Sequence, residues 1–182
     1  MKGVDQMYQV NDTVSYGTHG VCQIAEIGEK NLTGKSIEYY ILKPVYNESS
    51  TLYVPVHNEK LTGKMRRILS VQEIRKMIQD MPYHQEDWIE NENLRKTRYR
   101  ELLDEGNRTE LLKMLRTLYL HQQEQVSKGK KLHNTDERFF REAEKLLFDE
   151  IALVLHIKPN QVLPFILEQI QDADTSQKEV NI

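Results

Sequence analysis

The chain has 182 residues, of which 38% are apolar and 29% are charged, and its formal net charge is −3. This composition is too apolar and too balanced in charge for a disordered chain. The acidic net charge excludes a protein that coats nucleic acid through bulk positive charge, although it leaves room for a local basic patch. Cys22 is the one cysteine. We therefore exclude an intrachain disulfide and a multi-cysteine zinc site, and expect Cys22 to be a small buried residue.

The sequence also bears on the compartment. Its first ten residues lack the apolar core of a secretory signal. No stretch approaches the roughly 20 consecutive apolar residues that a membrane span needs. We expect a cytoplasmic protein with no membrane partner.

The first third of the chain has the texture of a small β-domain. Short apolar runs with partial alternation predict four strands, over residues 10–16, 21–27, 37–42 and 51–56. Glycine, asparagine and proline punctuate these runs. Four or five such strands favour a small, strongly bent barrel. Pro55, late in the fourth run, points to the edge or end of a sheet.

After about Leu69 the apolar spacing becomes helical. Ser70 and Glu73 fit a capping box, and the helix that they open should stop at Met81, before a proline. Further helices are predicted from Asp87 to about Gly106, from Asn107, from Asn134 or Thr135, and from Lys158-Pro159. The fold class is therefore α+β with two domains, residues 1–67 and 68–182, the latter with a frayed tail from about residue 172.

Catalytic chemistry is not found in the sequence. The glycines are spaced for turns and do not form a phosphate-binding loop. The six histidines do not occur at the i, i+4 spacing of a helical metal site, and His19 lies in a glycine-flanked turn where a structural role is expected. No motif in the sequence places a candidate nucleophile beside a candidate general base. We expect no enzyme activity, no metal and no cofactor.

Trp88, the only tryptophan, is the residue that stands out. It is predicted to lie at or near the start of a helix, and a run of four cations in six residues, from Arg95 to Arg100, follows it. Trp88 is either a core anchor between helices or an exposed aromatic that inserts into a minor groove. The cations form either a solvated helix face or a phosphate-binding surface. Seven residues span about two helical turns, so Trp88 and Arg95 are able to share a face.

The chain resembles the CarD family of bacterial transcription regulators. The segment from Val10 to Val21, VNDTVSYGTHGV, is similar to the opening motif of the family. Residues 35–43 and 52–56 resemble its central strand and its Val-Pro strand, and residues 88–107 resemble its tryptophan followed by a helix break. The resemblance covers roughly residues 8–170. It implies an N-terminal Tudor-like barrel, shared with transcription-repair coupling factor, followed by an all-α helical bundle.

The resemblance implies that the barrel binds the β subunit of RNA polymerase, largely by strand-to-strand pairing. The matching positions are Lys30, Leu32, Tyr53 and Val54. Family members often carry arginine at the first and third of these positions. Lys30 keeps the charge without the bidentate fork of arginine, and Tyr53 carries no charge.

The resemblance further implies that the helical domain lies on promoter DNA at the upstream edge of the transcription bubble. Trp88 would wedge into the minor groove, where DNA is recognised by shape and not by sequence. The expected phosphate contacts are Arg95, Lys96, Arg98 and Arg67. Glu90 and Glu92, close to Trp88, should weaken DNA binding, so we predict a modest effector.

These observations predict a monomeric, non-catalytic transcription regulator that bridges RNA polymerase and promoter DNA and stabilises the open complex. Its association with the nucleoid would arise through the polymerase. Two alternatives stay open. One is an adaptor that joins RNA polymerase to another protein without contacting DNA, and the other is an enzyme with an unrecognised site.

Overall fold

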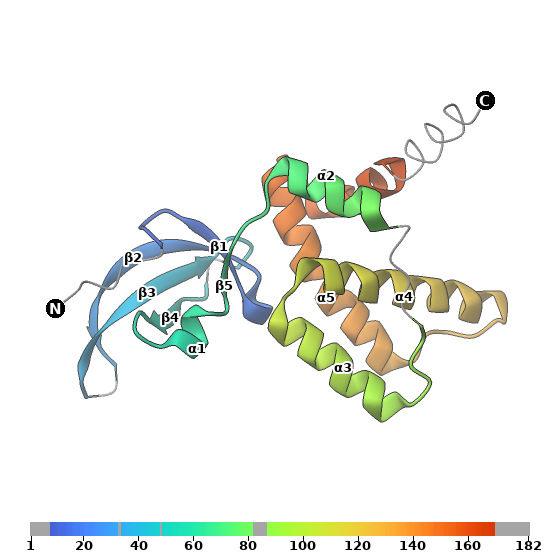
Figure 1. The fold of residues 1–182 in the computed structure, drawn as a ribbon, viewed down its shortest axis with the longest axis horizontal. Coiled ribbons are helices and arrows are strands. Elements are labelled where there is room, and N and C mark those ends of the chain that lie inside the picture. Colours follow the sequence, from blue (N-terminus) through green and yellow to red (C-terminus); the bar gives the residue numbers. More distant parts are fainter. Residues whose placement is uncertain (1–7, 33, 48, 82–86, 170–182) are drawn as a thin grey trace. The chain divides into compact units, whose positions relative to one another are not determined.

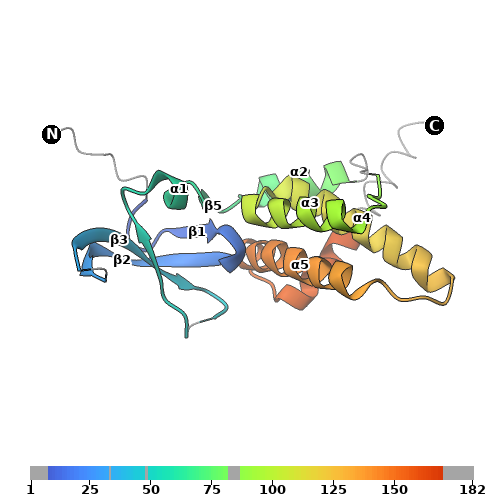
Figure 2. The same cartoon turned by 90° about the horizontal axis from the view of Figure 1, so that it is seen from below.

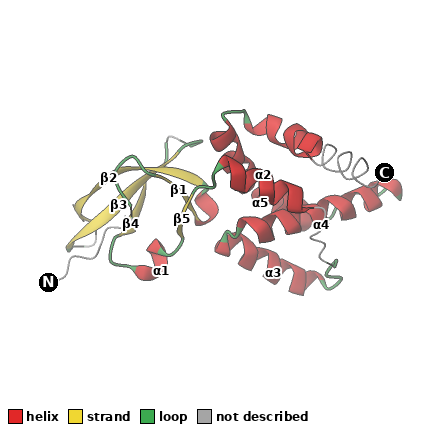
Figure 3. Cartoon of the chain, turned by 45° about the horizontal axis from the view of Figure 1, so that its top comes forward, coloured by secondary structure: helices red, strands yellow, loops and turns green. Residues whose placement is uncertain are grey.

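A computed structural model describes residues 8–32, 34–47, 49–81 and 87–169. The chain divides into two compact units, Met1–Ile68 and Leu69–Ile182. In the described residues the first unit is mainly strand and the second is helical (Figure 3). The predicted α+β fold class with two domains is confirmed.

The first unit holds a five-stranded antiparallel sheet with the strand order β4-β3-β2-β1-β5 (Figure 1). Its strands are β1 (Thr13–Tyr16), β2 (Val21–Asn31), β3 (Ser36–Pro44), β4 (Leu52–Pro55) and β5 (Met65–Arg67). A short helix, α1 (Glu59–Thr62), connects β4 to β5. The sheet is open, since β4 and β5 form its two edges and do not pair in the described residues. The small, strongly bent barrel predicted for this unit is thus a sheet that does not close in the described residues.

A β-bulge explains how β2 keeps its apolar side chains on one face. Ile24 pairs with Leu42 and the next paired residue is Glu26, opposite Ile41, so one extra residue is accommodated between them. Because of the extra residue, the side chains that follow the bulge point to the opposite faces from those that an uninterrupted strand would give. As a result Ile27 returns to the face of Ile24, where it packs on the core of the unit.

The second unit contains four long helices, α2 (Val71–Asp80), α3 (Glu92–Glu105), α4 (Arg108–Ser127) and α5 (Asn134–Leu155). A 3₁₀ turn, Pro159–Gln161, leads into a further helical stretch over residues 162–169. Both α3 and α4 pack against α5 (Figure 2). Their shared core includes Leu102, Leu118, Phe139 and Leu147, each at most 2% exposed.

Capping side chains fix where the helices begin. The predicted capping box of α2 is confirmed, since the Glu73 amide donates to Ser70 Oγ and the Ser70 amide donates to the Glu73 carboxylate. Asn107 caps α4 as predicted. The predicted start of α3 at Asp87 is wrong, because Asn91 accepts from two amides of the first turn and the helix starts at Glu92. The cap of α5 is His133, through its Nδ1, and not the predicted Asn134 or Thr135.

Candidate functional site

β4 is an edge strand of the sheet. One hydrogen bond shows which of its backbone groups face β3 and which point away from the sheet. The Val56 amide donates to the Glu38 carbonyl at 2.9 Å, so residues 52, 54 and 56 direct their backbone groups toward β3. By the alternation of an antiparallel ladder, the N–H and C=O of Tyr53 point away from the sheet. Pro55 has no N–H, and its carbonyl accepts from Asn58 at 3.1 Å. Tyr53 is therefore the centre of the available edge.

The side chains of Tyr53 and Val54 have different surroundings. Val54 is 1% exposed and belongs to the core of the first unit, and its N–H and C=O face β3, so it offers a partner neither its side chain nor its backbone groups. Tyr53 is 44% exposed, and its ring meets Tyr39 edge-on with the ring centres 6.1 Å apart. Of the two predicted positions on β4, only Tyr53 presents a side chain to a partner.

Lys30 and Tyr53 belong to one face of the sheet. Glu26 on β2 pairs with Ile41 on β3, which pairs with Tyr53 on β4. Lys30 Nζ donates to Glu26 Oε1 at 2.8 Å. This hydrogen bond is the main cause of the raised pKa of Lys30, to which the nearby Tyr53 phenol also contributes. Leu32, just beyond the end of β2, is 52% exposed.

We call the face of the sheet that carries Glu26, Lys30, Ile37, Tyr39, Ile41 and Tyr53 the outer sheet face. On it Ile37 and Tyr53 are exposed, whereas Tyr39 and Ile41 are buried. The sequence prediction did not select Ile37, Tyr39 and Ile41 for this face. The available signal was the run Ile37-Glu-Tyr-Tyr-Ile-Leu42, which is apolar on both faces instead of one. Such a strand has cover on both sides or a surface for a partner.

Trp88 lies before α3 in a non-helical segment of the second unit, is partly buried, and packs against the helical core. Its indole stacks on His121 of α4, with ring centres 3.6 Å apart and planes 9° apart. The guanidinium carbon of Arg95 lies 4.3 Å from the centre of the same ring. Two groups this close to one centre would overlap on a single face, so they cover opposite faces. The indole is held between them, and Trp88 as a whole keeps part of its surface exposed.

Arg95 is buried, with 5% of its surface exposed. Its Nε and Nη2 atoms donate to the two oxygens of Asp136 at 2.9 and 2.8 Å, and Nη1 donates to the Ile89 carbonyl at 2.6 Å. The hydrogen bond to Asp136 is the main cause of the raised pKa of Arg95, against the opposing effect of burial. The structure thus brings Trp88 and Arg95 together, but a bend in the backbone does so and not a shared helical face. Arg95 is not placed as a surface cation that would meet phosphate.

The other predicted cations are at the surface. Lys96 forms an ion pair with Glu92, whose pKa it lowers through a hydrogen bond. Arg98 Nη2 lies 3.7 Å from Glu110 Oε2, and the Arg98 side chain is 43% exposed. Arg67 belongs to β5 of the first unit and is exposed. Lys96 and Arg98 are thus available beside α3, with part of their charge balanced by acidic neighbours.

The loop between α4 and α5 supplies cations that the sequence prediction did not select. Lys128, Lys130 and Lys131 are exposed there. His133, at the end of this loop, places Nδ1 3.9 Å from Glu92 Oε1 at the start of α3. The loop therefore ends beside the first turn of the helix that follows Trp88. The available signal in the sequence was the lysine-rich run itself, at residues 128–131.

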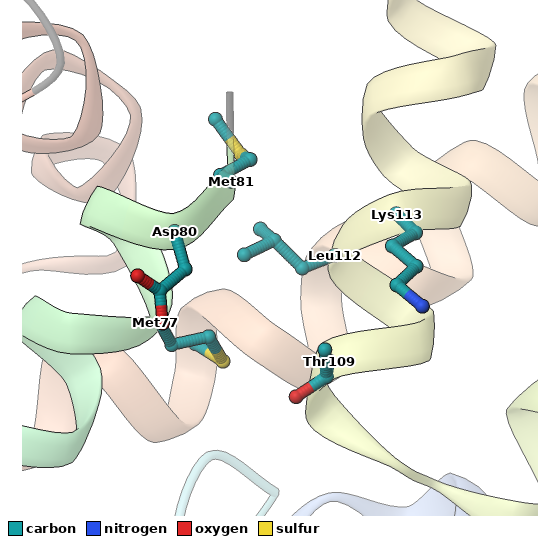
Figure 4. Close-up of a pocket in the computed structure, with 6 residues that line it drawn as sticks. All are labelled: Met77, Asp80, Met81, Thr109, Leu112 and Lys113. Carbon is teal, nitrogen blue, oxygen red and sulfur yellow. The ribbon is translucent and has the colours of Figure 1, made fainter. Parts of the chain in front are cut away.

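The described part of the chain has a larger apolar cavity of about 330 Å³, lined by residues that include Leu115, Phe140 and Leu167, and a small one between α2 and α4. It contains no group of three or more histidine, cysteine or acidic residues able to hold a metal, and none of its helices has the length and apolar character to cross a membrane. The small cavity between α2 and α4 has a volume of about 40 Å³ (Figure 4). That volume holds a few water molecules and no ordinary substrate. Its lining residues are Met77, Asp80, Met81, Thr109, Leu112 and Lys113.

Comparison with known families gives two matches. Residues 8–69 match the family model described as the CarD-like/TRCF RID domain. Residues 73–166 match the model described as the CarD C-terminal domain. The first match covers the sheet and its β4 edge, and the second covers the helices around Trp88.

Proposed function

Because the chain belongs to the CarD family, a family of non-catalytic domains that interact with RNA polymerase, we propose that it docks on the polymerase β subunit and stabilises the open promoter complex. The docking surface in this proposal is the β4 edge with the outer sheet face. The DNA-contacting surface is the exposed part of Trp88 with the cations around it. The observation that carries the proposal is the Trp88 indole, which is held by His121 and Arg95 while Trp88 stays partly exposed.

Strand addition explains the docking. An extended segment of the β subunit would pair with the outward N–H and C=O of Tyr53, and Val54 keeps the strand seated through its buried side chain. Specificity would come from the phenol of Tyr53, from the Lys30 ammonium on the outer sheet face, and from Leu32, which is exposed just beyond the end of β2. The Glu26–Lys30 pair holds the ammonium on the outer sheet face. Backbone pairing gives affinity, and these side chains select the partner.

DNA contact would rely on few groups. The indole edge of Trp88 would enter the minor groove, with Lys96, Arg98 and the lysines of the α4–α5 loop facing phosphates. Arg95 leaves the set of phosphate contacts because it is buried against Asp136. Its role is in holding Trp88. A protein held on the polymerase needs little DNA affinity of its own, because tethering raises the effective concentration. A net charge of −3 is compatible with that arrangement.

The effect on the open complex would be a shift in population. An indole that binds distorted or unpaired DNA more tightly than intact duplex favours the open state by the ratio of the two affinities. About 1.4 kcal/mol of differential binding multiplies the open-to-closed ratio by about ten. One aromatic contact of about 1–3 kcal/mol is enough for such a change.

The experiment measures open-complex lifetime with the wild type and with Trp88→Ala. We expect Trp88→Ala to bind polymerase as the wild type does and to lose the effect on lifetime. Tyr119→Ala is the matched control, because Tyr119 is an exposed aromatic of α4 outside the Trp88 stack. An unchanged lifetime with Trp88→Ala, at a promoter that the wild type affects, would remove the DNA contact from the proposal and leave a polymerase-binding adaptor.

A further inference from the structure

We propose that Arg95 and Asp136 are positioning residues that hold the Trp88 indole in the orientation in which it meets DNA. The inference rests on the proposed function for the role of Trp88. The inference concerns the orientation of the indole, which two sets of contacts of Arg95 fix. One set of contacts holds the backbone next to Trp88, and another holds the guanidinium over its ring.

Arg95 uses each part of its guanidinium for a different contact. Nη1 donates to the carbonyls of Ile89 and Glu90 at 2.6 and 3.3 Å, so it fixes the two peptide groups that follow Trp88. The guanidinium carbon lies 4.3 Å from the centre of the indole. A cation over an aromatic face is attracted by the ring quadrupole. Arg95 thus restrains both the main chain and the side chain of the segment.

Asp136 fixes the guanidinium itself. It is 2% exposed, lies in the first turn of α5, and accepts from Nε and Nη2 of Arg95. The two parallel hydrogen bonds set the plane of the guanidinium as well as its position. Since α5 is the longest helix and packs on both α3 and α4, Asp136 ties the Trp88 segment to the most extensively packed element of the unit.

His121 completes the arrangement from α4. Its ring is nearly parallel to the indole at 3.6 Å, on the face opposite Arg95. The indole is therefore restrained by α3 through Arg95 and by α4 through His121, and indirectly by α5 through Asp136. Movement of the indole in either direction normal to its plane meets one of these groups.

A second buried ion pair in the same unit shows what a purely structural pair does. Arg108 donates to both oxygens of Glu150 at 3.0 Å, and Glu150 also accepts from the Leu69 amide. This pair joins the start of α4 to α5. A buried ion pair gives little stability beyond that of an apolar pair, so geometry is the stronger reason for Arg95 and Asp136.

The test compares Arg95→Lys with Arg108→Lys in the full chain. Lysine keeps the charge but loses the planar fork, so it cannot hold Asp136 and the Ile89 carbonyl at the same time. Trp88 is the only tryptophan, so its fluorescence and its quenching by acrylamide report this segment alone. We expect Arg95→Lys to increase quenching and to reduce the effect on open-complex lifetime roughly tenfold, the size of one charge-assisted contact. Arg108→Lys should lower thermal stability comparably and leave the quenching of Trp88 unchanged.

Two results would overturn the inference. One is wild-type quenching and wild-type lifetime in Arg95→Lys, and the other is an equal change of both in Arg108→Lys. If Arg95→Lys is too unstable to assay, the double variant Arg95→Met/Asp136→Leu removes both charges without leaving one unpaired, and the same expectations apply to it. Failure of the proposed function has a different signature. Trp88→Ala would then leave the lifetime unchanged, while Arg95→Lys would still change the quenching of Trp88.

Discussion

Replacing Asp136 by asparagine should strongly destabilise the helical unit, because it leaves a buried guanidinium without its counter-charge. The side chains of Arg95 and Asp136 are 7% and 2% exposed. Breaking a buried ion pair by removal of one partner costs about 3–5 kcal/mol. Two contributions act in opposite directions. Arg95 keeps the carbonyls of Ile89 and Glu90, whereas α5 loses an acidic residue in its first turn, worth about 0.3–1 kcal/mol. We expect a loss of about 3 kcal/mol.

The measurement is urea unfolding of the full chain, followed by Trp88 fluorescence, which reports the helical unit separately from the sheet. With an m-value of about 1.5 kcal/mol per M, the midpoint should fall by about 2 M. The control is Glu124→Gln, since Glu124 pairs with Lys128 where both side chains are more than half exposed. Such an exposed pair contributes little to stability. If Asp136→Asn lowered the midpoint no more than Glu124→Gln, the pair would not have the energetic role that its burial indicates.

Three further predictions concern the sheet and one helix junction. Val54→Ala should destabilise the sheet by about 1–3 kcal/mol because Val54 is 1% exposed, whereas Tyr53→Ala should weaken polymerase binding at nearly unchanged stability, as measured by binding assays and thermal unfolding. Burial raises the pKa of Cys22 from 9.0 to about 11. The folded state then retains a proton that the unfolded state loses, so stability should fall by roughly 2–3 kcal/mol as the pH rises from about 9 to 11, and Cys22→Ala should remove most of this fall. Gly106→Ala should cost about 1 kcal/mol in thermal unfolding, because Gly106 ends α3 with a φ of 61°.

Each of these predictions has a contrary result. Equal loss of stability in Val54→Ala and Tyr53→Ala would contradict the orientation of β4. An alkaline stability profile that is the same in Cys22→Ala would assign the fall to another group. Unchanged stability in Gly106→Ala would mean that the junction between α3 and α4 relaxes without strain.

Local signals in the sequence were enough to predict most helix boundaries. Ser70 with Glu73, and Asn107 after Gly106, are short-range patterns whose hydrogen bonds close within four residues. The start of α3 was placed too early because the apolar spacing of Trp88 with later residues mimics a helix. The competing signal, Asn91 as a cap, is equally local. The carbonyls of Ile89 and Glu90 accept hydrogen bonds from Arg95, and the position of Arg95 depends in turn on Asp136 of α5, far along the chain.

The site was predicted in outline and not in its contacts. The predicted proximity of Trp88 and Arg95 rested on a shared helical face, whereas Trp88 precedes α3. The partner of Arg95 is 41 residues away on α5, and no pattern in a single sequence joins the two. The three-residue strand β5 was not predicted, because Met65–Arg67 is too short and too basic to show alternation. The strongly bent barrel was inferred from the number of short strands and their punctuation, and these do not determine whether the edges of the sheet meet.

The two edge strands of the sheet, β4 and β5, differ in how they would pair with a further strand. On β4, the proline at position 55 interrupts the row of donors, so a guest strand finds one residue with both groups on offer. On β5, Arg66 and Arg67 place like charges where another copy would have to approach. If identical chains paired edge to edge, the β4 edge would form few backbone hydrogen bonds, and the arginines of β5 would repel the approaching copy. In the proposed docking, the two edges therefore favour a short segment of another protein over further copies of this chain.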